Sequence, residues 1–296
     1  MASAGGAVRG ARGAACAVVV ASALVAGGAR AEAPRAVCAD PRQADGGPLA
    51  GGTDAADFGA IPEACAGTDV GLRLRGTALI ASSKPDFYGA VVATSTLRLR
   101  HNIGRSSWTW LSLAADLLTF RYVVNGPVAS DGFAFGPPTL GLHRALGDWP
   151  NTAGTAYARA LLPLDTARVG GVRTGFELGV TGRRVLGARG RAGVQGGLAM
   201  LAPIDVVGGQ THAALQPVAL AEAWWAYGPR FAVSGGVPAR AEVSPDPTFL
   251  ALAPRVAGRY SGRRGLSFSM LVEAPLAGED RTNIIVGFFL AWAAPG

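Results

Sequence analysis

The feature of this chain that most constrains its fold is an alternation of apolar and polar residues, which recurs from about residue 70 to the C-terminus. Segments of roughly ten residues carry it, and it is clearest in Val70–Ser82, Leu97–Arg100, Phe176–Thr181 and Ile284–Trp292. Successive side chains of a β-strand point to opposite faces, so each segment predicts a strand with one apolar and one polar face. The chain is therefore predicted to be all-β, with an up-and-down order of antiparallel strands.

About twelve strands are predicted in this way. Their ranges are Val70–Ser82, Phe87–His101, Ser107–Val124, Pro138–Leu146, Thr152–Leu164, Val172–Leu186, Arg191–Pro203, His212–Tyr227, Arg230–Val243, Thr248–Ser261, Gly265–Leu276 and Thr282–Trp292. Tight connections rich in Gly, Pro or Asn are expected at 102–106, 147–151, 187–190, 228–229 and 262–264. The connection over 125–137 is expected to be the longest, and those over 165–171 and 204–211 to be intermediate.

The third segment also fits a helix. Between Trp108 and Tyr122, four residues fall on one helical face: Leu111, Ala114, Ala115 and Leu118. A strand is favoured because its neighbours are strands and because alternate positions are apolar: Leu111, Leu113, Ala115 and Leu117.

The first 31 residues have the three parts of a secretory signal peptide. Arg9 and Arg12 form a basic region, residues 14–28 are apolar, and Ala29 and Ala31 fit the small-x-small cleavage pattern. An uncleaved membrane anchor is the alternative, but the apolar run is shorter than the ~20 residues that a spanning helix needs. Glu32 is thus predicted to be the first mature residue.

No later segment offers a transmembrane helix. The best candidate, Ala213–Tyr227, is interrupted by Gln216, Pro217 and Glu222. Only helices and closed barrels satisfy every backbone polar group in lipid, so a mature chain that spans a membrane must do so as a β-barrel. The rival fold is a soluble periplasmic β-sandwich, which would bury its apolar faces and expose its polar ones.

Phasing the strands separates their residues into two faces. The apolar face takes Leu72, Leu74, Leu97, Leu99, Leu111, Leu113, Phe176, Leu178, Val180, Val194, Leu198, Leu266, Phe268, Val286, Phe288, Leu290 and Trp292. The opposite face takes Arg73, Arg75, Arg98, Arg100, Asp116, His143, Arg159, Glu177, Arg183, Gln195, Glu222, Arg240, Arg255, Arg259 and Glu273. An Arg in lipid at mid-depth costs about 2 to 4 kcal/mol, so the apolar face is predicted to meet lipid and the charged face to line a lumen.

Aromatic residues gather near the predicted strand ends, as in the girdles that flank a membrane-spanning barrel. These residues are Trp108, Trp110, Trp224, Trp225, Tyr227, Tyr260 and Trp292.

The last strand carries a second signal. Gly287, Leu290 and Trp292 follow a glycine-x-x-hydrophobic-x-hydrophobic pattern, which resembles the assembly signal of outer-membrane barrels. Together with the secretory signal and the strand pattern, the chain resembles Gram-negative outer-membrane β-barrel proteins over residues 70–292. The resemblance implies a membrane-spanning barrel in the outer membrane, with its lipids and the barrel-assembly machinery as partners.

Residues 32–69 lack the alternation and are predicted to be an irregular segment, lying either in the periplasm or in the barrel mouth as a plug. Cys38 and Cys65 remain after removal of the signal peptide, an even number in an oxidising compartment, so they are predicted to form a disulfide. The predicted domains are thus 1–31, 32–69 and the barrel at 70–296.

The charge pattern limits the function classes. The 27 basic and 20 acidic residues are dispersed, so nucleic-acid binding is not predicted, and neither is a metal or other cofactor site. A lumen with more Arg than carboxylates predicts passage of small polar, preferably anionic, solutes without chemical change. The alternative for the same residues is a network of Arg–carboxylate pairs that fills and closes a narrow barrel.

Two other classes stay open. An outer-membrane hydrolase would need a Ser beside a His, which none of His101, His143 and His212 has in sequence, or acids and a His at the rim. Candidates for the rim are Asp205 with His212, and Glu279 with Asp280. A structural or surface-display barrel would present the connections at 125–137 and 204–211.

Overall fold

The structure is a computed structural model of the chain. It describes residues 69–81, 88–103, 109–124, 132–134, 136–149, 151–166, 171–186, 191–207, 210–228, 230–243, 249–262, 266–274, 276 and 283–295. The predicted signal peptide, the segment up to residue 68 and the proposed Cys38–Cys65 disulfide lie outside these residues, as do Trp108, Glu279 and Asp280. Among the described residues, no helix is long and apolar enough to cross a membrane.

The described part of the chain is built from strands. They are β1 (Asp69–Ala81), β2 (Tyr88–Asn102), β3 (Thr109–Val124), β4 (Gly132–Ala134), β5 (Thr139–Trp149), β6 (Thr152–Thr166), β7 (Gly171–Leu186), β8 (Ala192–Val207), β9 (Gln210–Ala213), β10 (Gln216–Ala226), β11 (Phe231–Glu242), β12 (Phe249–Leu252), β13 (Arg255–Ser261), β14 (Leu266–Glu273) and β15 (Asn283–Pro295). Each of the twelve predicted ranges coincides with one of these strands or with two that follow one another. The region around Leu111 that also fitted a helix is strand β3.

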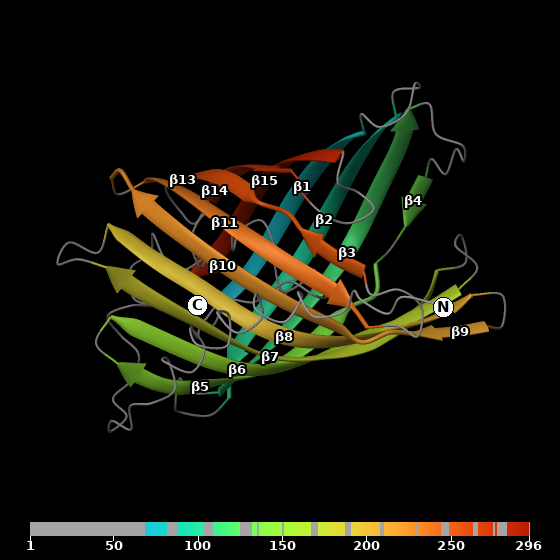
Figure 1. The fold of residues 1–296 in the computed structure, drawn as a ribbon, viewed down its shortest axis with the longest axis horizontal. Helices are drawn as coiled ribbons and strands as arrows, with labels where there is room; N and C mark the ends of the chain where they lie inside the picture. Colours follow the sequence, from blue (N-terminus) through green and yellow to red (C-terminus); the bar gives the residue numbers. More distant parts are fainter. Residues whose placement is uncertain are drawn as a thin grey trace, which may run out of the picture.

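Every long strand pairs antiparallel with its neighbours in the chain (Figure 1). The pairing runs from β1 through β2, β3, β5, β6, β7 and β8 to β10, and on through β11, β13, β14 and β15. Strand β15 pairs with β1 over the full length of both, from Asp69↔Pro295 to Ala81↔Asn283, so the pairings return to their start. The predicted all-β, antiparallel, up-and-down fold is confirmed.

Prolines explain why three short strands, β4, β9 and β12, are separated from the longer strands β5, β10 and β13 that follow them in the same register. Strand β4 continues β5 in one register along β3, and Pro137 and Pro138 lie between them. Strands β9 and β10 pair with β8 one after the other in the same register, and the break between them lies opposite Pro203. The carbonyl oxygen of Pro203 accepts a hydrogen bond from Ala214 N at 3.3 Å. Proline has no N–H to return that bond, so the ladder is interrupted without changing register. Strands β12 and β13 meet in the same way, since Ala253 N donates to Pro238 O.

Two predicted connections are therefore wrong in extent. Residues 125–137 are not one loop, because they contain β4. Residues 204–211 are not an intermediate loop, because β8 runs to Val207 and β9 begins at Gln210. In both places a proline marks an interrupted ladder rather than the end of a strand.

The tight turn between β5 and β6 shows the local chemistry expected of a hairpin. Trp149 pairs with Thr152 across it. Asn151, just before Thr152, has a φ of 64°, in the left-handed region that Asn tolerates better than most residues.

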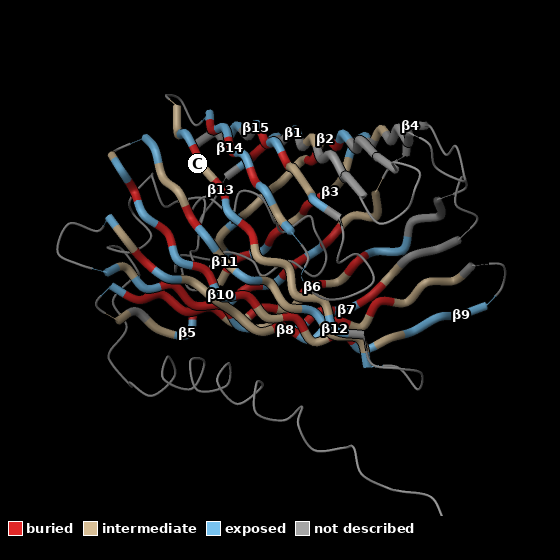
Figure 2. Tube along the Cα trace, turned by 45° about the horizontal axis from the view of Figure 1, so that its top comes forward, coloured by how far each residue is buried: buried red, intermediate tan, exposed pale blue. Residues whose placement is uncertain are grey.

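Burial alternates along the strands, and the sense of the alternation decides between the two predicted folds (Figure 2). Charged residues lie on the buried face, as Arg159 and Glu177 do at 2 % and 1 % exposed. Large apolar residues lie on the other face, as Phe176 and Leu178 do at 61 % and 64 % exposed. A β-sandwich with an apolar core would have the opposite pattern.

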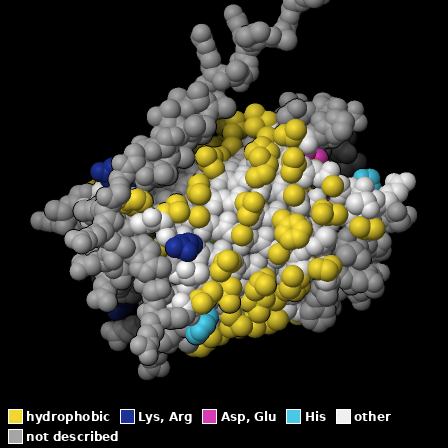
Figure 3. Space-filling model, turned by 90° about the horizontal axis from the view of Figure 1, so that it is seen from below, with side chains coloured by type: hydrophobic (Ala, Val, Ile, Leu, Met, Phe, Trp, Pro, Cys, Tyr) yellow, Lys and Arg dark blue, Asp and Glu magenta, His cyan; other side chains and the backbone are white. Residues whose placement is uncertain are grey.

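Apolar side chains gather on the outer face, as one view of it shows (Figure 3). It contains the residues predicted for it whose side chains are more than a third exposed: Leu72, Leu74, Leu111, Phe176, Leu178, Val180, Val194, Leu266, Phe268, Phe288, Leu290 and Trp292. Arg144 and Arg184 are charged residues that also lie exposed on this face of β5 and β7.

Candidate functional site: the inner wall

The residues predicted for the polar face lie mostly on the buried face of the strands, here called the inner wall. Seven of them are at most 5 % exposed: His143, Arg159, Glu177, Arg183, Glu222, Arg255 and Arg259. Five are partly buried: Arg98, Arg100, Asp116, Gln195 and Glu273. Arg240 is exposed, and the side chains of Arg73 and Arg75 are outside the described set.

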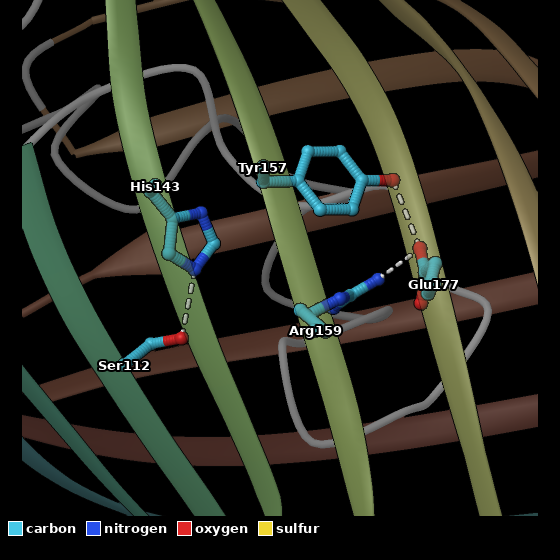
Figure 4. Close-up of polar contacts among 5 residues, drawn as sticks. All are labelled: Ser112, His143, Tyr157, Arg159 and Glu177. Atoms are coloured by element: carbon cyan, nitrogen blue, oxygen red, sulfur yellow. Dashed lines mark hydrogen bonds and ion pairs between the residues drawn. The ribbon is translucent and has the colours of Figure 1, made fainter.

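An ion pair between neighbouring strands forms the most buried part of the inner wall (Figure 4). Arg159 on β6 stands directly opposite Glu177 on β7, and its Nη2 lies 2.5 Å from Glu177 Oε1. Both side chains are 0 % exposed. Tyr157, two residues before Arg159 and on the same face, donates its hydroxyl to the same Oε1 at 2.9 Å. The carboxylate is thus held by two charge-assisted hydrogen bonds.

A serine and a histidine meet beside this ion pair. Ser112 Oγ on β3 lies 2.8 Å from His143 Nε2 on β5, and both residues are buried. They meet over Gly141: a Cβ there would lie 2.4 Å from Ser112 Oγ and 2.7 Å from His143 Nε2. Any larger residue at position 141 would push the two side chains apart.

Aromatic rings extend this cluster around the wall. Trp110, His143 and Tyr157 stand opposite one another on β3, β5 and β6. The rings of Trp110 and His143 are 5.2 Å apart with a 9° interplanar angle, and those of His143 and Tyr157 are 5.9 Å apart at 24°. The guanidinium of Arg159 lies 5.0 Å from the centre of the Tyr157 ring. The cluster therefore links β3, β5, β6 and β7, which are successive neighbours in the sheet.

Inner-wall aromatics lie against glycines. A Cβ at Gly179 would be 2.5 Å from the Tyr157 hydroxyl, and one at Gly193 would be 2.4 Å from Trp224 Cζ2. A Cβ at Gly287 would be 2.9 Å from the ring of Phe289. Each of these aromatic rings therefore lies along the inner wall, over a glycine.

A second polar row runs along the wall from β7 to β14. Successive cross-strand neighbours in this row are Arg183, Gln195, Glu222, Gly236, Arg255 and Glu273. Gln195 Nε2 donates to Glu222 Oε2 at 2.6 Å. The Arg183 guanidinium lies 4.9 Å above the ring of Trp224, an arrangement that stabilises a cation over an aromatic face.

Two smaller groups of hydrogen bonds lie elsewhere on the wall. Thr96 Oγ1 donates to Asp116 Oδ1 at 2.7 Å, joining β2 to β3. Gln216 Nε2 donates to Glu242 Oε2 at 2.8 Å, and Gln216 Oε1 accepts a bond from Arg240 Nη2. The carboxylates of Asp116 and Glu242 thus accept bonds from neutral donors.

The structure corrects the predicted aromatic girdle. Trp110 and Trp224 do not face outward, since they are 2 % and 5 % exposed on the inner wall. Their spacing could have shown this, because Trp110 alternates in phase with Ser112, and Trp224 with Glu222. Aromatics do lie outward near the turns that follow β10 and β13, as neighbours in one cross-strand row: Tyr227, Phe231, Tyr260 and Phe268.

The contact between Ser112 and His143 is the feature that the sequence did not reveal. The two residues are 31 positions apart, and only the pairing of β3 with β5 brings them together. Adjacency in the chain does not reveal this contact, because no Ser stands beside His143 in the sequence. Among the described residues, no group of three or more His, Cys, Asp and Glu side chains could hold a metal ion.

Comparison with known proteins bears on this fold. No family model matches the chain, and no curated protein matches it. A solved outer membrane channel from Pseudomonas putida F1 is similar over 81 % of this chain and 99 % of its own, with a TM-score of 0.60 and 14 % identity. This likeness shows that the chain shares the fold of that solved outer-membrane protein.

Two further solved barrels are similar at lower scores. The NanC porin matches 76 % of this chain and 99 % of its own, with a TM-score of 0.48 and 8 % identity. The translocator domain of the autotransporter NalP from Neisseria meningitidis matches 78 % of this chain and 88 % of its own, with a TM-score of 0.47 and 10 % identity.

Proposed function

We propose that this barrel is an outer-membrane channel through which small polar solutes, preferably anions, pass without chemical change. One observation carries the proposal: the strands expose most of their large apolar side chains outward and turn most of their charged side chains inward. Lipid is the environment that such an outer face fits, and water with dissolved ions is the content that such an inner face fits. The proposal includes outer-membrane lipids around the apolar face, and recognition of β15 by the barrel-assembly machinery.

Large aromatic side chains that lie along the inner wall support the proposal of an open lumen. Tyr157 and Trp224, two of its largest side chains, lie along the wall over Gly179 and Gly193. Small side chains occupy other inward positions of the wall, as Ala257 does on β13. A wall covered by flat rings and small residues leaves more width for solutes than one with side chains that point at the axis.

Anion preference follows from the charges on the inner wall. Several of its carboxylates accept hydrogen bonds from neutral side chains, as Glu222 does from Gln195 and Asp116 from Thr96. The residues predicted for the polar face include more Arg than carboxylates. That excess gives the lumen a positive field, which raises the local concentration of anions.

A hydrolase is the second candidate, and the hydrogen bond between Ser112 and His143 is the observation that favours it. A serine nucleophile needs its histidine oriented by a third group. His143 Nδ1, however, is buried and has no hydrogen-bond partner among the described residues. Ester hydrolysis by the purified protein that Ser112→Ala abolishes would place the hydrolase ahead of the channel.

Planar-bilayer recording on the refolded full-length chain tests the proposal. We expect discrete conductance steps and, in a gradient of KCl, a reversal potential displaced toward the chloride equilibrium potential. Heat-denatured protein in the same detergent is the control. Absence of conductance in every salt would contradict the channel and favour the closed, structural barrel.

A further inference from the structure

Two Arg residues lie on the outer face, where a channel has no use for charge. Arg144 alternates in phase with Leu142 on β5, and Arg184 with Val180 on β7, and all four side chains are exposed. An Arg that faces lipid is costly at mid-depth in a bilayer and far less so near the headgroups. The position of this pair therefore indicates contact with headgroups.

The strand neighbours of both Arg residues are uncharged. The residues opposite them in register are Thr109 and Ala156 for Arg144, and Thr152 and Val194 for Arg184. The next outward residues on their own strands are Leu142, Leu146, Gly182 and Leu186. Within the described strands, these neighbours supply no negative charge to either guanidinium.

A tryptophan lies on the same part of the outer face. The register shift between Ala145 and Gly147 places Gly147 opposite Gly154, which faces outward on β6 because it alternates with the inward Tyr157. A Cβ at Gly154 would lie 3.4 Å from Trp149 Cζ3, and one at Gly147 would lie 2.9 Å from Trp149 Cζ2. The Trp149 ring therefore covers these two glycines on the outer face.

Trp149 lies between the two Arg residues. On β6, Gly154 is two residues from the position opposite Arg144 and two from the position opposite Arg184. With strands about 4.8 Å apart and a rise of about 3.3 Å per residue, the two Arg Cα atoms are about 16 Å apart. Two extended Arg side chains can reach toward each other over that distance, with one phosphate group between them.

The group lies near the end of the barrel where the connections are short. Trp149 is the last residue of β5, before a turn to Thr152, and Arg184 is two residues from the end of β7. Arg144 starts five residues before Trp149, and its long side chain lets the guanidinium reach toward the interface. Tryptophan is typical of the membrane–water interface, and the short turns of outer-membrane barrels face the periplasm.

We propose that Arg144, Trp149 and Arg184 bind the headgroup of an anionic phospholipid in the periplasmic leaflet. This inference rests on the membrane location in the proposed function, and not on conductance. A guanidinium presents a planar fork of N–H donors that matches two phosphate oxygens. The amphipathic Trp149 ring suits the boundary between headgroup and acyl chains. A zwitterionic headgroup is bound less well, because its positive group is repelled by both Arg residues.

Quenching of tryptophan fluorescence by brominated lipids tests this proposal on the refolded full-length chain. Trp149 is kept as the only tryptophan, and the others are replaced by Phe. Vesicles contain phosphatidylglycerol and phosphatidylcholine, with one or the other brominated, so the two series give the relative association of the two lipids at Trp149. We expect about fivefold or more preference for phosphatidylglycerol, as for one Arg near an anionic surface. Arg144→Gln/Arg184→Gln is expected to remove this preference.

A variant with Trp292 as the only tryptophan is the matched control. Trp292 is 46 % exposed on the outer face and stands between Leu72 and Leu266, the first residue of β14, where a short turn ends. We expect no preference between the lipids there, with or without the two Gln substitutions. Heat-dependent gel mobility shows that each variant is folded.

The outcomes separate this inference from the proposed function. Equal preferences at Trp149 and Trp292, or a preference at Trp149 that Arg144→Gln/Arg184→Gln leaves unchanged, would overturn the lipid site while the channel stands. Loss of the preference in excess inorganic phosphate would also overturn it, because the site would then take a free anion. Absence of quenching at both tryptophans would contradict the membrane location, and with it both proposals.

Discussion

Some inner-wall positions are occupied by glycine because an aromatic ring lies where a Cβ would be. The Tyr157 ring covers Gly179, and a Cβ at position 179 would also lie 2.8 Å from the carbonyl oxygen of Leu198 on the next strand. Because that oxygen belongs to the backbone, it cannot turn aside as a side chain could. The ring and the glycine therefore depend on each other, as in other sheets where an aromatic covers a glycine.

Replacing Gly179 by Ala is expected to lower the free energy of unfolding by about 1–3 kcal/mol, the usual cost of overpacking. Gly76→Ala is the matched control, because nothing lies within 4 Å of a Cβ at Gly76 on β1. That change is expected to be neutral or to stabilise the protein by about 0.4–1 kcal/mol. Urea unfolding of the refolded protein in vesicles measures both, and equal effects would contradict the close contact.

The ion pair of Arg159 and Glu177 predicts a second effect at single residues. Glu177→Gln leaves the buried Arg159 without its carboxylate, which is expected to cost about 3–5 kcal/mol. Replacing both, as Arg159→Met/Glu177→Leu, is expected to recover most of that loss because no buried charge remains. The same urea titration tests this, and a single variant as stable as the wild type would show that water reaches the pair.

At the scale of strands, the sequence predicted where the strands lie better than it predicted where they are interrupted or end. Strand ranges followed from the alternation, because a lipid-facing and a water-facing side impose it on each strand. Some predicted strand ends were wrong because a proline was taken to end the strand. Pro203 indicated the end of a strand, yet β8 continues to Val207. A proline whose carbonyl still accepts a bond interrupts one rung of the ladder without ending the strand.

Strand β7 offers a test of the lipid-facing side. Leu178 lies in its middle and Leu186 at its end, and both point outward at 64 % and 43 % exposed. Leu178→Arg is expected to cost about 2–4 kcal/mol in a bilayer, and Leu186→Arg about 0–1, because the cost falls toward the interface. Arg184 already lies exposed next to Leu186 on that face. Equal costs for the two variants in vesicles would place the membrane boundary elsewhere.

At the scale of the molecule, the two faces were predictable and the contacts across strands were not. Alternation assigned Arg159, Arg183 and Arg255 to the buried polar face, because a residue's face depends only on its parity along the strand. The meeting of Ser112 with His143 depends on the register between β3 and β5, which the alternation leaves open. The same limit hid which Arg residues stand opposite carboxylates, as Arg159 stands opposite Glu177 and Arg255 opposite Glu273.

Two adjacent tryptophans test the orientation of the whole barrel. Trp224 is 5 % exposed on the inner wall, and Trp225, the next residue, is 52 % exposed on the outer face. In single-tryptophan variants, with the other Trp residues replaced by Phe, bromine-labelled acyl chains are expected to quench Trp225 fluorescence strongly and Trp224 fluorescence little. The two residues share one strand and one depth, so only the face of the barrel distinguishes them. Equal quenching, or stronger quenching of Trp224, would mean that lipid does not lie where the apolar face requires it.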